Sequence, residues 1–248
     1  MTPKSRRAFH IVLIAAPLVI VLAAWQWPRV DAIAGVITAR VSPSASVRQR
    51  LGQYGDAVRS RMEPLFKTAG VAYPAARLAF IGLKEEKRFE LWAANPEGPM
   101  HLVKTYPIKA ASGGPGPKLR EGDRQVPEGI YAIESLNPNS RYHLSLRVNY
   151  PNAFDRDRAR EENRANLGGD IMVHGKAVSI GCLAMGDEAV EELFVLAALA
   201  GTKNIEVLLC PRDLRTRACS PPGNAPAWTA VVYQNLQTAL TPYTTAGP

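Results

Sequence analysis

Residues 170–194, DIMVHGKAVSIGCLAMGDEAVEELF, restrict the fold of this chain more than any other stretch. An apolar start predicts a buried strand that ends at His174, and apolar residues at helical spacing predict a helix, with Asp187 as its cap. The loop between them consists of small residues and carries Cys182. A loop of this length can fold back, so that the thiol and the imidazole lie within hydrogen-bonding reach.

A thiol beside an imidazole is the arrangement that a cysteine nucleophile and its base require. Gly181 would allow a tight turn, so that its own amide and that of Cys182 could point at one oxyanion. Ser179 is a candidate to orient the ring of His174, the alternative being a loop hydroxyl that faces solvent. The pair as a whole also fits a small buried cysteine beside a core histidine, because free cysteine is commonly buried.

Several stretches in order resemble one known family. VHGKAVSIGCLAM resembles the His-Gly…Ser-x-Gly-Cys signature of the YkuD-type L,D-transpeptidases, and EGDRQVPEGIY at 121–131 is similar to their TPxGxY turn. Residues 137–160 and GGDIMVHG at 168–175 are similar to the branch called YafK-like murein transpeptidases. The resemblance spans residues 78–213. It implies a YkuD-like β-sandwich and a periplasmic thiol enzyme that acts on peptidoglycan stem peptides, with no metal or organic cofactor.

The resemblance also implies a mechanism, in which Cys182 forms a thioester and His174 acts as the base. Many relatives follow the Gly-Cys pair with a hydrophobic residue and then Arg, whereas this chain has Leu183 and Ala184. Losing a fixed guanidinium beside the nucleophile puts donor recognition in doubt. Three activities therefore stay open. An amine could capture the thioester, as in a transpeptidase, or water could hydrolyse it, as in an L,D-carboxypeptidase or an amidase that releases a cell-wall-linked lipoprotein. The chain could also bind peptidoglycan without turnover.

Three basic side chains are candidates to bind substrate carboxylates, since guanidinium groups match carboxylate geometry. They are Arg141, His143 and Arg147, around the start of a strand predicted at 143–150. The alternative is an exposed strand face. Asp170 could orient His174, although a capped turn is the favoured interpretation.

Composition limits the remaining classes. The net charge is +8, but acidic and basic residues are intermixed and no basic stripe carries aromatics, so nucleic-acid binding is not indicated. Three cysteines without CxxC spacing and four histidines do not predict a zinc site. Cys210 and Cys219 would either remain free or form a disulfide, which the loop-entropy model values at roughly 2.7 kcal/mol.

Residues 1–34 predict a signal peptide or an uncleaved signal anchor. Lys4, Arg6 and Arg7 precede an uncharged apolar stretch, which suits either interpretation and puts the rest of the chain outside the cytoplasm. The expected location is therefore the periplasm or cell envelope, with a membrane anchor if the segment is retained. Ser5-Arg6-Arg7-Ala8-Phe9 also resembles a twin-arginine signal.

The rest of the chain divides into three parts and predicts a mainly β fold with flanking helices (α+β). Residues 35–76 are a linker and an N-terminal helix at 46–69 that stops at Gly70. Residues 77–213 form the catalytic domain, with strands at 78–84, 89–93, 101–108, 129–136, 143–150, 171–173 and 205–209 and a helix at 187–200. The charged run 155–165 is a solvated helix, a mobile loop or a substrate lid. Residues 214–248 are a loosely ordered tail, with a short helix at 234–240.

Overall fold

The computed structural model describes residues 44–244, and from Ala45 onward they belong to a single structural unit. The export segment predicted at 1–34, with its twin-arginine motif, lies outside these residues. Within 44–244, none of the helices has both the length and the apolar character needed to cross a membrane.

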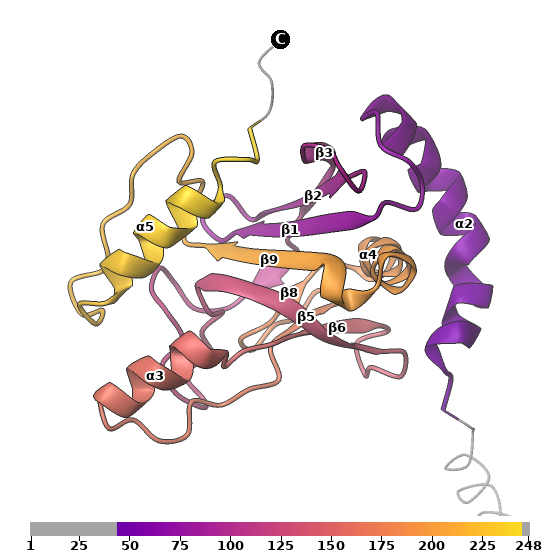
Figure 1. Cartoon of the computed structure of the whole chain (residues 1–248). Helices are drawn as coiled ribbons and strands as arrows, with labels where there is room; N and C mark the ends of the chain where they lie inside the picture. Colours follow the sequence, from indigo (N-terminus) through magenta and orange to yellow (C-terminus); the bar gives the residue numbers. More distant parts are fainter. Residues whose placement is uncertain (1–43, 245–248) are drawn as a thin grey trace, which may run out of the picture. The chain divides into compact units, whose positions relative to one another are not determined.

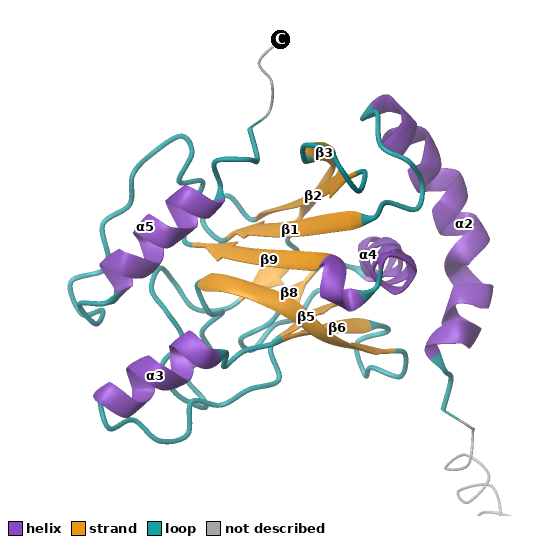
Figure 2. Cartoon of the chain, viewed as in Figure 1, coloured by secondary structure: helices purple, strands orange, loops and turns teal. Residues whose placement is uncertain are grey.

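Helices and strands alternate irregularly along the described chain (Figure 1, Figure 2). In chain order they are α2 (Val47–Thr68), β1 (Arg77–Leu83), β2 (Arg88–Ala94), β3 (His101–Pro107), β4 (Ala110–Ala111), β5 (Gly129–Asn137), β6 (Ser145–Val148), α3 (Ala153–Glu161), β7 (Met172–His174), β8 (Leu183–Ala184), α4 (Asp187–Ala200), the 3₁₀ turn η1 (Thr202–Asn204), β9 (Ile205–Cys210) and α5 (Thr229–Ala239).

All the strands belong to one mixed sheet with the order β3-β2-β1-β9-β5-β6-β7-β8-β4. The pairs β1·β9 and β7·β8 are parallel and the others are antiparallel. The sheet curls until distant strands touch: a Cβ at Gly82 of β1 would lie 3.3 Å from the Leu183 side chain of β8. The predicted mainly β fold with flanking helices is confirmed.

Two apolar layers lie on opposite faces of the central strands. Phe80 of β1 faces the layer that contains α4 and the buried side of α2, while its neighbours Ala79 and Ile81 face the layer under α5. Because β1 is buried on both faces, its sequence is a continuous apolar run instead of an alternating pattern. Figure 1 shows α2 and α4 on one side of the central strands and α5 on the other.

The N-terminal helix α2 is attached to the core by both apolar and charged contacts. A capping box between Ser46 and Gln49 begins the helix, and Gly70, at φ +72°, follows its end as predicted. Glu192 of α4, which is completely buried, accepts hydrogen bonds from Arg61 of α2 and from Lys104 and Tyr106 of β3. This buried carboxylate therefore links α2, α4 and β3.

The predicted helix at 187–200 is confirmed, but its cap is not. Gly186 is the N-cap, and the Asp187 carboxylate instead accepts the Lys176 amide at 2.8 Å. The strand predicted at 143–150 is shorter, Ser145–Val148, because His143 has φ +76° and belongs to the preceding turn. The charged run forms α3, whose capping box joins Asn152 and Asp155.

The expectation of a loosely ordered tail is wrong for residues 214–244. Helix α5 starts earlier than predicted and buries Val232 and Leu236, which pack with Leu240 and Tyr243 against the outer face of the central strands. The composition, rich in Pro, Thr and Ala, concealed this apolar stripe at spacings of three and four. Arg215 also donates to the Tyr243 carbonyl at 2.8 Å, which ties the end of the described chain to the sheet.

The disulfide considered between Cys210 and Cys219 is not formed, and both thiols are free. Cys210 ends β9 and is completely buried, and this burial raises the pKa of its thiol. Cys219 is only half-buried, in the segment that leads toward α5. Both thiols border the same apolar layer, so they act as small apolar side chains here.

Candidate active site

The neighbouring parallel strands β7 and β8 bring His174 and Cys182 to one region. Val173 lies opposite Leu183 and His174 opposite Ala184. Cys182 immediately precedes β8, so the register places it beside Met172, two residues before His174 on the adjoining strand. The loop from 175 to 182 thus folds back and brings Cys182 next to the strand that carries His174.

The tautomer of His174 is fixed by its own neighbour. The ring is 2% exposed, and its Nδ1 lies 2.6 Å from the carbonyl oxygen of Gly175. A carbonyl only accepts hydrogen bonds, so Nδ1 carries the proton and Nε2 of the neutral ring keeps a free lone pair. Burial lowers the pKa of His174, and the Gly175 carbonyl opposes this in part.

Tyr142 covers the imidazole, which sequence reasoning missed. The two rings lie with centroids 4.6 Å apart and planes tilted by 34°, and Tyr142 remains 39% exposed. Gly175 makes this packing feasible, because a Cβ there would lie 2.6 Å from both the Tyr142 carbonyl oxygen and the Asp187 carboxylate. The only sequence signal was an aromatic residue inside the stretch 137–160 that resembles the family.

The Cys182 thiol does not bond to the imidazole in this structure. Its Sγ donates to the Asp170 carbonyl oxygen at 3.5 Å, and no hydrogen bond joins it to His174 among the described residues. Burial raises the pKa of Cys182; the Met172 amide and the Lys118 ammonium oppose this rise, and the Asp170 carboxylate adds to it. The thiol is therefore the favoured resting form.

Ser179 acts on the nucleophile's backbone and does not contact the histidine. Its hydroxyl donates to the Cys182 carbonyl at 2.6 Å and accepts from the Cys182 amide at 3.1 Å. The Gly181 amide, at a residue with φ +99°, donates to the hydroxyl of Ser112 at 2.6 Å. Both amides expected to form an oxyanion hole are thus occupied by hydroxyl groups, because a small polar loop must satisfy its own backbone donors.

Two of the three basic side chains predicted to meet substrate are already paired. Arg147 lies 2.7 Å from Glu134 and 2.8 Å from Asp170, so Asp170 does not orient the imidazole. The Nε2 of His143 lies 2.9 Å from Glu191. Arg141 is exposed and has no polar partner within residues 44–244, so it is the one candidate that remains free for a ligand.

A buried cation near the nucleophile comes from Lys118, which the sequence did not single out. Lys118 is 6% exposed, and its Nζ donates to Asp123 at 2.6 Å and to the Arg120 carbonyl at 2.8 Å. Its charge is one of those that act on the Cys182 thiol. The residue lies just before the stretch at 121–131, so only proximity to that motif could have pointed to it.

The curled sheet, with His174 on β7 and Cys182 just before the adjoining strand β8, is the arrangement of a YkuD-type catalytic domain. The family model of the YkuD L,D-transpeptidase catalytic domain matches residues 79–207, just over half of the 248 residues. The chain belongs to this family. Both candidate catalytic residues lie inside the matched region.

Several known proteins are similar to this chain. "Putative L,D-transpeptidase YafK" of Escherichia coli K12 is 38% identical over 133 residues, 52% of this chain and 51% of that protein, and the protein of that name from strain O157:H7 matches equally. The chain spans about half the length of these curated relatives. The helical cell shape determining protein Pgp2 from Campylobacter jejuni is 21% identical, with a TM-score of 0.44 over 54% of this chain and 47% of that one. Mycobacterium tuberculosis L,D-transpeptidase 1 is 18% identical, with a TM-score of 0.32 over 54% and 62%.

Proposed function

We propose that this protein is a cysteine-dependent L,D-transpeptidase that acts on peptidoglycan stem peptides. In this proposal Cys182 forms a thioester with the stem peptide, and His174 is the base. Family membership, with His174 at the end of β7 and Cys182 just before the adjoining strand β8, both inside the matched region, is the observation that carries the proposal. Amino-acid side chains supply all of this chemistry.

The pKa directions favour general base catalysis over a preformed ion pair. Burial raises the pKa of Cys182 and lowers that of His174, so the resting pair is a thiol and a neutral imidazole. The thiol turns from the Asp170 carbonyl toward Nε2 of His174, which takes the proton as Sγ attacks the peptide carbonyl. His174 then protonates the departing amine, and a thioester remains.

An acceptor completes the cycle at the thioester carbonyl. His174 takes a proton from an amine or a water, the acceptor attacks, and the thiol is regenerated. Each tetrahedral intermediate needs donors for its oxyanion. The amides of Gly181 and Cys182 can serve once the oxyanion displaces the hydroxyls of Ser112 and Ser179 that now occupy them.

Water is the second candidate acceptor, which would make the protein an L,D-carboxypeptidase or an amidase that releases a cell-wall-linked lipoprotein. Ala184 favours this alternative because it stands where many relatives carry an arginine. The Ala184 side chain is completely buried in β8, so the site has no guanidinium at this point. Under either alternative, residues 1–34 would export or anchor the protein in the periplasm or cell envelope.

The test is turnover of purified muropeptides by the soluble domain, with and without excess diamino-acid acceptor, followed by mass spectrometry. Cross-linked product indicates amine capture, and trimmed product in the presence of acceptor indicates hydrolysis. Cys182→Ala should abolish both products, while Cys219→Ala, the matched half-buried thiol, should retain them. Unchanged products from Cys182→Ala would exclude the thioester mechanism.

A module that only binds peptidoglycan is distinguished by binding without turnover. In either case iodoacetamide should label Cys182 slowly at neutral pH, because its pKa is raised, and faster as the pH increases, so turnover is the deciding measurement. His174→Ala should reduce turnover roughly 10²- to 10⁴-fold, the range for loss of a general base. Native protein that binds muropeptides but forms no product would establish the binding module.

A further inference from the structure

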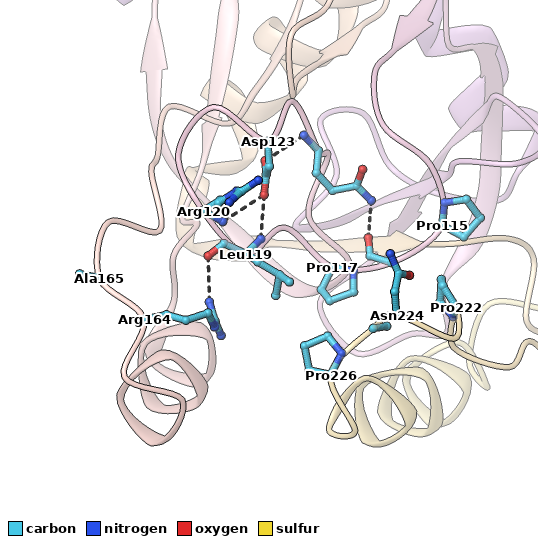
Figure 3. A pocket seen from close by; sticks show the side chains of 13 residues that line it. Pro115, Pro117, Leu119, Arg120, Asp123, Arg164, Ala165, Pro222, Asn224 and Pro226 are labelled. Carbon is cyan, nitrogen blue, oxygen red and sulfur yellow. Dashed lines mark hydrogen bonds between the residues drawn. The ribbon is translucent and has the colours of Figure 1, made fainter.

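A pocket of about 570 Å³ lies beside the nucleophile loop and outside the proposed catalytic pair. Figure 3 shows it between the segment 115–125, Arg164 after α3, and the segment 222–226 before α5. Its volume is within the range of small-molecule and peptide sites. Residues 222–226 lie beyond the region matched by the family model, so one wall is an addition to the matched domain.

The apolar part of the pocket lining is rigid. Four prolines line the pocket: Pro115, Pro117, Pro222 and Pro226. Proline has a fixed φ and no amide donor, so these positions are conformationally restricted and offer no N–H group to a ligand. Several other lining amides are already bonded within the protein, so side chains are the main source of donors for a polar ligand; these amides belong to Gly116, Leu119, Arg120, Gln125 and Ala225.

Two guanidinium groups supply such donors. Arg120 is exposed, and its side chain has no polar partner within residues 44–244. Arg164 donates through Nη1 to the Leu119 carbonyl at 2.9 Å and through Nε to Glu162 at 2.6 Å. Its Nη2 has no partner in the described part of the chain, so an already positioned guanidinium keeps free N–H groups.

The carboxylate that lines the pocket does not compete for these donors. Asp123 accepts from Lys118 at 2.6 Å and from the amides of Leu119, Arg120 and Gln125 at 2.9 to 3.0 Å. Burial would raise the pKa of Asp123, but Lys118 and these amides hold it below its ordinary value. Its charge is thus compensated locally, and the arginines are left for an anionic ligand.

The pocket shares a wall with the nucleophile loop. A Cβ at Gly181 would lie 3.5 Å from the carbonyl oxygen of Gln125, and Gln125 also lines the pocket. Lys118, which neutralises Asp123 at the pocket, also acts on the Cys182 thiol. The pocket lining and the nucleophile loop are therefore in direct contact at Gln125 and Gly181.

We propose that this pocket binds a carboxylate-bearing peptide. Arg120 and Arg164 hold the carboxylate, the Asn224 side-chain amide bonds to a peptide group, and the prolines pack on aliphatic parts. The choice of peptide rests on the proposed function: it is the part of the stem peptide that carries free carboxylates, outside the bond that reacts.

The test measures binding without turnover, by calorimetry on the Cys182→Ala protein. The probes are the tripeptide L-Ala-γ-D-Glu-diaminopimelate and its fully amidated form. We expect the free acid to bind at least ten times more tightly than the amide, and Arg120→Gln to remove most of that preference. Arg48→Gln is the matched control, because Arg48 is exposed on α2, has no polar partner in 44–244, and belongs to a helix that contributes no residue to the pocket.

The proposal that the pocket binds a carboxylate would be overturned by equal affinity for the free acid and the amide. Equal effects of Arg120→Gln and Arg48→Gln would overturn it as well. The muropeptide assay separates this result from failure of the proposed function. If the native protein turns over muropeptides but Arg120→Gln does not change peptide binding, only the proposed role of the pocket is overturned. Carboxylate-dependent binding that Arg120→Gln abolishes, without turnover by the native protein, would support the pocket and remove the transpeptidase proposal.

Discussion

The Gly175 carbonyl sets the chemistry available to His174. It accepts the Nδ1 proton, which leaves Nε2 as the basic atom, and the surrounding burial disfavours the charged ring. The imidazole is therefore neutral over a wider pH range than a free histidine.

We expect the acidic limb of the kcat/KM profile to lie below pH 6.5, the ordinary pKa of histidine. The base must be neutral to act, so activity falls only as the pH drops through the lowered pKa of His174. Initial rates of muropeptide turnover between pH 4.5 and 8 would measure this limb. A limb at or above 6.5 would contradict the neutral buried ring.

Tyr142 is a second residue that controls the environment of His174, because its ring covers the imidazole. Tyr142→Ala should expose the imidazole and move the acidic limb upward toward 6.5. We expect kcat to fall roughly 10- to 100-fold, the size of effect that a misplaced catalytic group produces. Tyr142→Phe keeps the ring and should retain both the rate and the limb. A phenylalanine variant as impaired as the alanine variant would instead assign the role to the hydroxyl.

The candidate catalytic pair could be predicted because its signals are contiguous in sequence. His174 and Cys182 are eight positions apart and belong to one motif. Ser112, which occupies the Gly181 amide, is 69 positions from its partner. The partners of Arg147 and His143 come from other elements, so no local pattern could show that these side chains are already paired.

Among the elements, the attachment of α2 depends most on one charged residue. Glu192 is completely buried and is surrounded by Arg61, Lys104 and Tyr106. Removing one member of a buried ion pair leaves uncompensated charge and typically costs about 3 to 5 kcal/mol.

Glu192→Ala should therefore lower the free energy of unfolding by about 3 to 5 kcal/mol, measured by urea denaturation. Glu188→Ala is a suitable control on the same helix, because Glu188 is exposed and should change stability by less than about 1 kcal/mol. Equal effects of the two variants would show that α2 is held by its apolar face alone.

Element length explains which parts of the fold the sequence could predict. The periodic helices α2 and α4 and the longer strands follow from their apolar spacing. The two-residue strands β4 and β8 are too short to show any period, and they arise from pairing with distant segments. Helix α5 was placed too late because its first buried residue, Thr229, is polar.

For the whole molecule, one buried carboxyl should shape the dependence of stability on pH. Burial raises the pKa of Asp155 to about 6, although the Asn152 amide and the Tyr131 hydroxyl oppose this. A carboxyl whose pKa is higher in the folded state than in the unfolded state stabilises the fold at pH values below its unfolded-state pKa. This contribution is lost as the pH rises through its folded-state pKa.

Unfolding free energy should therefore decline between about pH 4 and pH 6, by at most about 3 kcal/mol for a shift of about two pH units. Asp155→Asn cannot ionise and should flatten the profile over this interval. Urea titrations at half-unit steps would measure both proteins. An equally steep decline in the variant would assign it to other groups.

The order of strands in the sheet also determines when this domain can fold during its synthesis. β9 lies between β1 and β5, yet it is the last strand that the ribosome makes; Leu78, near the start of the domain, pairs with Ile205. The strands on either side have no common partner until Cys210 has emerged, and such long-range pairing is slow. A nascent chain that stops at residue 204 should therefore be digested by protease at sites that the complete domain protects. The central sheet can therefore close only near the end of translation, and until then the strands made earlier lack the partner that joins them.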